Sequence, residues 1–105
     1  MIKKYEIQDD KLHDVICFEI EDDYTLRVVF DDNTEQIINF EPILLGPIFG
    51  PLRDLELFNK VRLDADLGTL VWPNGADIAP TVLHDWPQHI EAIIARRKKQ
   101  FAVTV

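Results

Sequence analysis

Cysteine is almost absent from this chain of 105 residues, which contains Cys17 and no other. A single cysteine cannot form a disulfide within the chain, so the sequence is typical of a reducing compartment. Long apolar runs are lacking as well, since a membrane span needs roughly 18 consecutive apolar residues. The first residues do not have the apolar core and cleavage site of a secretory signal. We therefore expect a cytoplasmic protein with no membrane partner.

Glycine is scarce, and its positions argue against a phosphate-binding loop. The chain has four glycines, and Gly46 and Gly50 are each followed by proline, which has no N–H to donate to a phosphate. Histidines in a metal-binding pattern are lacking too. His84 and His89 are five residues apart, whereas two ligands on one helical face need a spacing of three or four. His13 stands alone before the first expected strand, so the sequence predicts no metal and no cofactor.

A catalytic set of residues cannot be assembled from the sequence. Cys17 has Glu19 and Glu21 as neighbours, and acidic neighbours disfavour the thiolate that a reactive cysteine needs. We interpret Cys17 as a buried or half-buried structural residue. The acidic pairs Asp22-Asp23 and Asp31-Asp32 fall at predicted turns, where carboxylates are usually solvated. We expect that the protein is not an enzyme.

Acidic residues outnumber basic ones, and the net charge is -8 at neutral pH. The last ten residues are the exception, because they contain four bases and no acid: Arg96, Arg97, Lys98 and Lys99. An acidic body repels phosphate backbones, which argues against nucleic acid as a partner. The four bases complement the negative end of a helix. Alternatively, they contact phosphate, a membrane surface or the acidic body of a second copy, which would give a homodimer.

The first half of the chain has the alternation of apolar and polar residues that predicts β-strands. Three such segments follow one another, over residues 15–21, 24–30 and 35–40. In the first segment Ile16, Phe18 and Ile20 share the face that we expect to be buried. Asn33 suits the tight turn before the third segment, because asparagine accepts the left-handed conformation. These features predict an antiparallel meander with one buried face.

The second half of the chain combines short helices with one further hairpin. Gly46-Pro47 and Gly50-Pro51 predict a stiff apolar link. The helical and strand-like segments after it cover residues 52–58, 61–64, 69–72, 80–84 and 87–99. Pro80 and Pro87 suit the first positions of the last two helices. We therefore predict a single α+β domain over residues 1–105, with the C-terminal helix packed on one face of the sheet.

Three blocks of the sequence resemble a known family. The blocks are residues 24–33, residues 52–61, and residues 68–80, which contain Trp-Pro-Asn-Gly-Ala-Asp-Ile-Ala-Pro. They are similar to the small bacterial domain-of-unknown-function family 2442, over about residues 12–84. Asn33 stands where that family usually has glycine, and Ala79 where a capping serine is common. The resemblance implies a bacterial, cytoplasmic α+β domain with no known catalytic residues, and it does not include the helix 87–99.

Two tryptophans and one turn complete the candidate sites. Trp72 and Trp86 are predicted to cap the core. Asn74 and Gly75 predict a turn, and Asp77 is predicted to tie the backbone beside it. The candidate interaction or ligand surface consists of Trp72, Asn74, Asp77, Trp86, Arg96, Arg97, Lys98 and Lys99.

The leading hypothesis is a non-catalytic protein-interaction or regulatory module, antitoxin-like, that binds a small basic protein encoded nearby. It depends on the acidic body, on the missing catalytic set, and on the resemblance, since some members of the family are encoded beside small toxin-like proteins. One alternative is a small-ligand sensor in which Trp72 and Trp86 line a pocket. The less favoured alternative is direct DNA binding through Arg96–Lys99.

Overall fold

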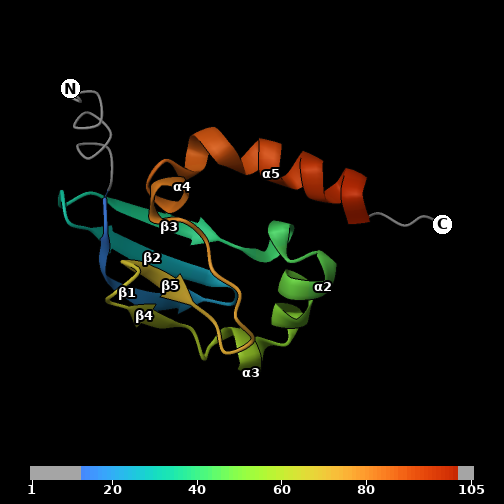
Figure 1. Cartoon of the computed structure of the whole chain (residues 1–105), viewed down its shortest axis with the longest axis horizontal. Coiled ribbons are helices and arrows are strands. Elements are labelled where there is room, and N and C mark those ends of the chain that lie inside the picture. Colours follow the sequence, from blue (N-terminus) through green and yellow to red (C-terminus); the bar gives the residue numbers. More distant parts are fainter. Residues whose placement is uncertain (1–12, 102–105) are drawn as a thin grey trace.

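The computed structural model describes residues 13–101, and Figure 1 shows how they are arranged. The elements follow the chain in the order β1 (Val15–Asp22), β2 (Thr25–Phe30), β3 (Glu35–Asn39), η1 (Glu41–Ile43), α2 (Gly46–Phe49), η2 (Gly50–Arg53), α3 (Leu55–Phe58), β4 (Arg62–Asp64), β5 (Thr69–Val71), α4 (Pro80–His84) and α5 (Trp86–Phe101). The first three strands form an antiparallel sheet in the order β1-β2-β3, and β4 pairs with β5. The chain is α+β, as the sequence predicts.

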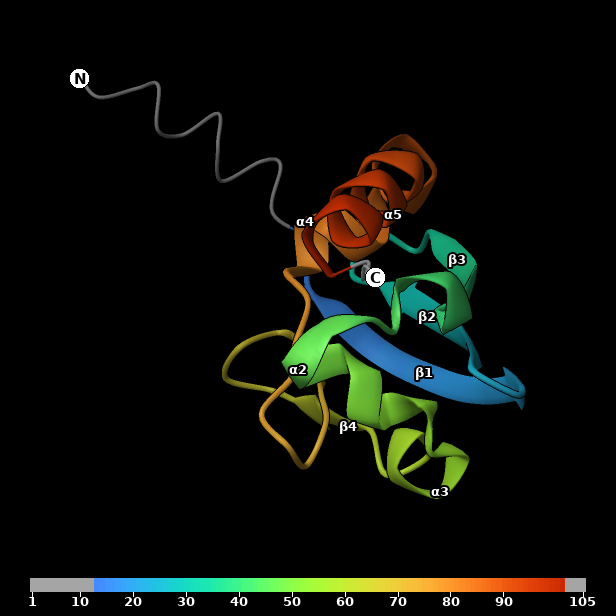
Figure 2. The same cartoon turned by 90° about the vertical axis from the view of Figure 1, so that its right-hand side faces the viewer.

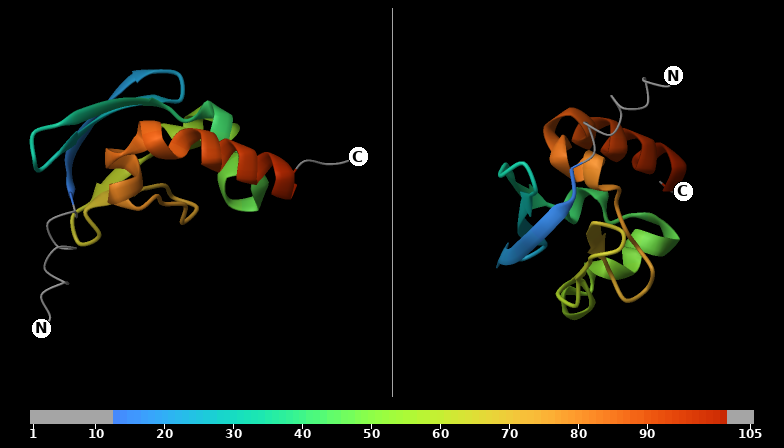
Figure 3. Two further views of the ribbon diagram at one scale, coloured as in Figure 1. Left: turned by 90° about the horizontal axis from the view of Figure 1, so that it is seen from above. Right: turned by 60° about the vertical axis from the view of Figure 1, so that its left-hand side comes forward.

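Strand β2 is the centre of the larger sheet, and its alternation separates the two faces of that sheet. Leu26, Val28 and Phe30 are fully buried, while Arg27 between them points to the outer face and is only partly buried. Figure 3 (left) shows the sheet at one side of the molecule, with α4, α5 and the β4–β5 pair all on its inner side. The strand therefore has the buried face that its sequence predicts.

Strand β1 differs from the expected pattern because it contains a bulge. Val15 lies opposite Phe30, but Cys17 lies opposite Val29, so β1 has one residue more than β2 over this stretch. The extra residue gives the inward position to Val15 and leaves Ile16 about half exposed. Cys17 is exposed on the outer face. The predicted burial of Ile16 and Cys17 is therefore wrong.

Ile20 is a second exception on β1. It lies opposite the buried Leu26 and so belongs to the inner face. Strand β1 is at the edge of the sheet, however, and 48% of the Ile20 surface remains exposed. Its predicted burial is wrong as well, whereas Phe18 packs partly buried against the core.

Aromatic side chains from four segments meet in the core. The Phe40 ring centroid lies 5.8 Å from those of Phe58 and Trp72, and 5.5 Å from that of Trp86. The indole Nε1 of Trp72 donates a 3.0 Å hydrogen bond to the carbonyl oxygen of Phe58. Trp72 is 2% exposed and Trp86 is 6% exposed. The prediction that the two tryptophans cap the core is confirmed.

Residues 46–51 are helical, where the sequence predicts a stiff link. Gly46 and Gly50 begin the short helices α2 and η2, with a proline next in each. Gly46 has a φ of +93°, and the ring of Phe101 lies so close that a β-carbon on Gly46 would be 2.7 Å from it. Glycine is thus needed here both for the backbone conformation and for the contact with the end of α5. Figure 2 shows α2 and α3 on the β4 side of the core and α4 with α5 on the other.

The segment after β5 is the tight turn that its sequence predicts. Gly75 has a φ of +90° and donates its N–H to the Trp72 carbonyl at 2.9 Å. The Asn74 side chain accepts a hydrogen bond from the Ala76 N–H and donates one to the Ile48 carbonyl at 2.7 Å. Asp77 pairs through its backbone with Val71. Asn74 therefore fixes the turn against α2.

Helix α5 begins one residue before and ends two residues after the predicted 87–99. Ile93 is buried and Ile90 and Ile94 are partly buried, which confirms the expected apolar stripe. Within residues 13–101, no helix is both long enough and apolar enough to cross a membrane.

The hydrogen bond of Trp72 can be tested by comparing two substitutions. We expect W72F to destabilise the protein more than W86F by about 0.5–1.5 kcal/mol, because W72F removes a buried hydrogen bond and leaves the Phe58 carbonyl with only the N–H of Val61, at 3.2 Å. Urea unfolding followed by circular dichroism measures both changes in the free energy of unfolding. Equal losses for the two variants would show that the hydrogen bond adds nothing beyond ring packing.

Candidate functional site

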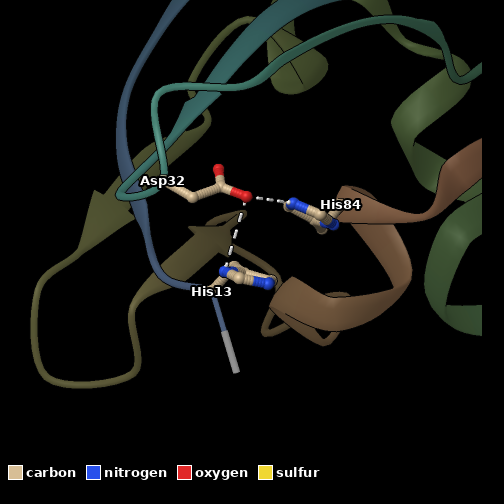
Figure 4. Close-up of side chains that lie close together, drawn as sticks. All are labelled: His13, Asp32 and His84. Atoms are coloured by element: carbon tan, nitrogen blue, oxygen red, sulfur yellow. Dashed lines mark hydrogen bonds and ion pairs between the residues drawn. The ribbon is translucent and has the colours of Figure 1, made fainter. Parts of the chain in front are cut away.

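Three side chains from distant parts of the sequence meet at one end of the sheet, as Figure 4 shows. His84 Nε2 lies 2.8 Å from Asp32 Oδ2, and His13 Nδ1 lies 3.6 Å from the same oxygen. The two imidazole rings are stacked, with centroids 4.1 Å apart and planes inclined by 20°. The sequence predicts that His13 is isolated, and this prediction is wrong.

Local structure fixes Asp32 in the turn between β2 and β3. Its Oδ1 accepts hydrogen bonds from the N–H and the hydroxyl group of Thr34, at 3.1 and 2.6 Å. Oδ2 is therefore left to face the two histidines. The predicted turn at Asp31–Asn33 is confirmed, and Asn33 has a φ of +72°. Asp32 is not simply solvated, however, because it bonds to a histidine from α4.

The two histidines are held by different contacts. His84 ends α4, its carbonyl accepts a 2.7 Å hydrogen bond from Gln36 of β3, and its ring meets Phe30 edge-on. Its Nδ1 lies 2.8 Å from Asp85 Oδ1. His13 is positioned by the backbone beside it, since the Asp31 N–H donates to the carbonyl of Asp14 at 2.9 Å.

The carboxylates favour the protonated form of His84. Burial alone lowers the pKa of His84, but the hydrogen bonds to Asp85 and Asp32 outweigh it, so the pKa is raised above 6.5. Hydrogen bonds from Thr34 and His84 lower the pKa of Asp32. Both ring nitrogens of His84 face carboxylate oxygens, so each carries a proton in the imidazolium form. A histidine bonded on both sides has no free lone pair with which to act as a general base.

The predicted interaction residues lie elsewhere and do not form one surface. A groove of about 360 Å³ lies between α2 and α5, and Asp77, Arg96 and Arg97 are among the residues that line it. Trp72 and Trp86 are buried in the core and line neither this groove nor the two further grooves beside Asp77. The expectation that they line a ligand pocket is therefore wrong.

The four bases of α5 have different environments, because Arg97 is half-buried and the other three are exposed. Arg97 is half-buried, donates a hydrogen bond to the Ile43 carbonyl, and places its guanidinium 4.3 Å from the centre of the Phe49 ring. Burial lowers the pKa of Arg97. Arg96, Lys98 and Lys99 are exposed, and only the two lysines lie in the last turn of the helix. Arg97 thus packs against the core, in contrast to the predicted cluster of four in the last turn.

The outer face of the sheet was not singled out by the sequence, although it is open and strongly polar. Arg27 at its centre contacts Glu19 at 2.6 Å, Glu21 at 3.1 Å and Glu35 at 3.4 Å. Ile37 lies directly beside Arg27 on β3 and is 66% exposed. Alternation in β2 and β3 already assigns these residues to one face, and this signal could have identified the surface.

The His84 cluster predicts a pH dependence of stability. A raised pKa in the folded state means that His84 stabilises the fold below its ordinary pKa and loses this effect as the pH rises through the folded value. Asp32, with a lowered pKa, stabilises above its ordinary value and loses the effect in acid. The cluster therefore stabilises the folded state most between pH 3.8 and pH 6.5, the ordinary pKa values of an aspartate and a histidine.

We expect H84Q to lower the midpoint of thermal unfolding more at about pH 5.5 than at about pH 8.5. Differential scanning calorimetry at the two pH values measures the change. H89Q is the matched control, because His89 lies on α5 outside the cluster. An H84Q effect that is the same at both pH values would contradict the carboxylate pairing.

The structural role of Arg97, which its basic neighbours do not share, can also be tested. We expect R97A to reduce the free energy of unfolding by about 1–3 kcal/mol, since it removes a hydrogen bond and a cation–π contact. K98A should change it by less than about 0.5 kcal/mol, as is usual for exposed residues. Denaturant titration measures both values, and equal effects would mean that Arg97 is an ordinary surface base.

Comparison with protein families gives a match for most of the described chain. The model of the family described as "Protein of unknown function (DUF2442)" matches residues 15–88. No curated protein and no solved structure matches the chain. The matched region contains the three-stranded sheet, the β4–β5 pair, α4 and the first residues of α5. The chain therefore belongs to the DUF2442 family.

Proposed function

We propose that this protein is a non-catalytic interaction module of the antitoxin-like or regulatory kind, and that the outer face of β1-β2-β3 binds a small basic protein encoded nearby. The observation behind this proposal is that the outer face is open and carries three carboxylates around one arginine, with an exposed isoleucine at its edge. A sheet face of this kind is suited to a flat protein surface.

The register of the strands supports the proposal, because it gives the face an ordered pattern. Across one row lie Cys17, Val29 and Glu35, and across the next lie Glu19, Arg27 and Ile37. Apolar side chains thus alternate with charged ones over three adjacent strands. Protein–protein interfaces mix apolar and polar area, and arginine is enriched in them.

The charge of the face indicates the sign of the partner. Arg27 neutralises one of the three carboxylates that surround it, so Glu19, Glu21, Glu35 and Arg27 together carry a net charge of -2. The side chains of Glu19 and Glu35 are more than half exposed. A basic partner would be attracted over the distance of a Debye length and would replace Arg27 as the counter-charge.

The absence of catalysis in this proposal is supported by the chemistry of the titratable groups. Both nitrogens of His84 are occupied by carboxylates. His84 therefore has no free lone pair with which to accept a proton from a substrate. Cys17 is exposed, and the charged side chains that follow it on β1, Glu19 and Glu21, are acidic rather than basic.

The proposal is tested by co-expression with the product of the adjacent gene, followed by gel filtration and titration calorimetry. We expect one co-eluting peak and an affinity that falls as salt is added. The double variant E19Q/E35Q should weaken binding by about tenfold or more, since it removes two exposed charges from the face.

The matched control is E56Q/D66N, which removes the same number of charges from exposed positions on α3 and in the turn between β4 and β5. It should leave the affinity unchanged. Two separate peaks, or equal losses for both double variants, would refute the role of the outer face. A peak at twice the mass of the chain without any partner would indicate a homodimer instead.

A further inference from the structure

We propose that His13, Asp32 and His84 form a binding site for a divalent transition-metal ion of the zinc class. Two imidazole nitrogens and one carboxylate oxygen are donors that such ions prefer. One donor atom from each residue lies within 4.8 Å of the others. The three residues come from the segment before β1, the β2–β3 turn and the end of α4, as Figure 4 shows.

Two of the three distances between donor atoms are close to those of a tetrahedral site, and all three donors lie within 4.8 Å of one another. Zinc bonds to nitrogen and oxygen are about 2.0–2.2 Å long, which places neighbouring donors roughly 3.3 Å apart. Here His84 Nε2 and His13 Nδ1 lie 2.8 and 3.6 Å from Asp32 Oδ2. An ion that replaces the proton between His84 and Asp32 would widen the shorter distance by about half an ångström. The turn and the helix end need to separate only by that amount.

Asp85 provides a second, independent argument. Metal-binding histidines usually donate their other ring N–H to a carboxylate, which fixes the ring and its tautomer. His84 has this arrangement, because its Nδ1 lies 2.8 Å from Asp85 Oδ1 while its Nε2 faces Asp32. Thr34 holds the remaining oxygen of Asp32 in the same way. Two of the three ligands therefore already have their supporting contacts.

The stacking of the two rings determines which residue must move. A metal ion lies close to the plane of each imidazole that binds it, so two rings that share an ion cannot remain stacked. His84 is bonded on both sides, whereas His13 Nδ1 lies 3.6 Å from both Asp31 and Asp32, beyond hydrogen-bond distance. The ring of His13 would therefore turn toward the ion and leave the stack.

An ion at this position would link three segments that are far apart in the chain. It would link His13, before β1, to the β2–β3 turn and to the end of α4, at the same end of the sheet. With three protein ligands, a fourth position remains for water or for the nearby carboxylate of Asp31. The family match begins at residue 15, so it includes Asp32 and His84 but not His13.

The test uses the full chain after treatment with a chelator and exchange into a non-coordinating buffer. Zn²⁺ is titrated by isothermal calorimetry, and Co²⁺ binding is followed by visible absorption. We expect one ion per chain, the visible bands of a four-coordinate Co²⁺ site, and a rise in the unfolding midpoint of about 10 °C when free Zn²⁺ is 100 times its dissociation constant.

Substitutions assign the ligands. H13Q, D32N and H84Q should each weaken Zn²⁺ binding by more than about tenfold, and D85N by about tenfold. H89Q is the matched control for loss of a histidine, and C17S is the control for the exposed thiol. Both controls should bind as the unmodified chain does. The NMR signals of the His13 ring should shift on binding as the stack opens.

H13Q decides the question, because His13 precedes β1 and its ring makes no hydrogen bond within residues 13–101, so its replacement should preserve the fold. Far-UV circular dichroism checks this. The proposal is overturned if the unmodified chain binds no Zn²⁺ stoichiometrically, if H13Q binds as tightly as the unmodified chain, or if C17S abolishes binding.

Discussion

The packing of Phe40 against Phe58, Trp72 and Trp86 is the interaction on which the rest of this structure depends. Phe40 follows β3, Phe58 ends α3, Trp72 follows β5 and Trp86 begins α5, so one set of ring contacts joins four segments. The hydrogen bond from Trp72 to the Phe58 carbonyl orients one of the two indole rings. Because all these side chains point inward, the helices and the β4–β5 pair gather on one side of the larger sheet, and its other side stays open.

The pairing of β1 with β2 links the two surfaces for which we propose a function. Val15 lies opposite Phe30. Two residues before Val15 is His13 and two residues after Phe30 is Asp32, so the same register brings these two side chains together. The bulge after Val15 then shifts β1 so that Cys17 and Glu19 face outward beside Val29 and Arg27. A slip of one residue would reverse the faces of the strand and separate the cluster. The acidic face and the histidine cluster therefore depend on one register.

Local sequence patterns predict most of the fold, while the sites depend on contacts between distant residues. Alternation and proline positions predict the strands, the last two helices and the core tryptophans, because each is decided within a few residues. The bulge at Ile16 is not visible in the alternation of β1, so the exposure of Ile16 and Cys17 was missed. The meeting of His13 with Asp32 depends on the same bulge, because the register without it would place Asp14 opposite Asp32. The addition of His84 could not have been predicted either, since it requires the position of α4 against β3.

The residues that suggest chemistry in the sequence are largely occupied by internal contacts. Arg97 is bound to Ile43 and Phe49, and the Asn74 side chain is bound to Ile48. An arginine or amide that is used in this way loses packing if it turns toward a ligand, so it is a poor recognition group. Binding at the outer face loses no such packing, because its carboxylates are already exposed to solvent. A basic partner would take the place of Arg27 as the group that pairs with them. Open charge on a rigid sheet favours binding to a protein surface over chemistry at a single residue.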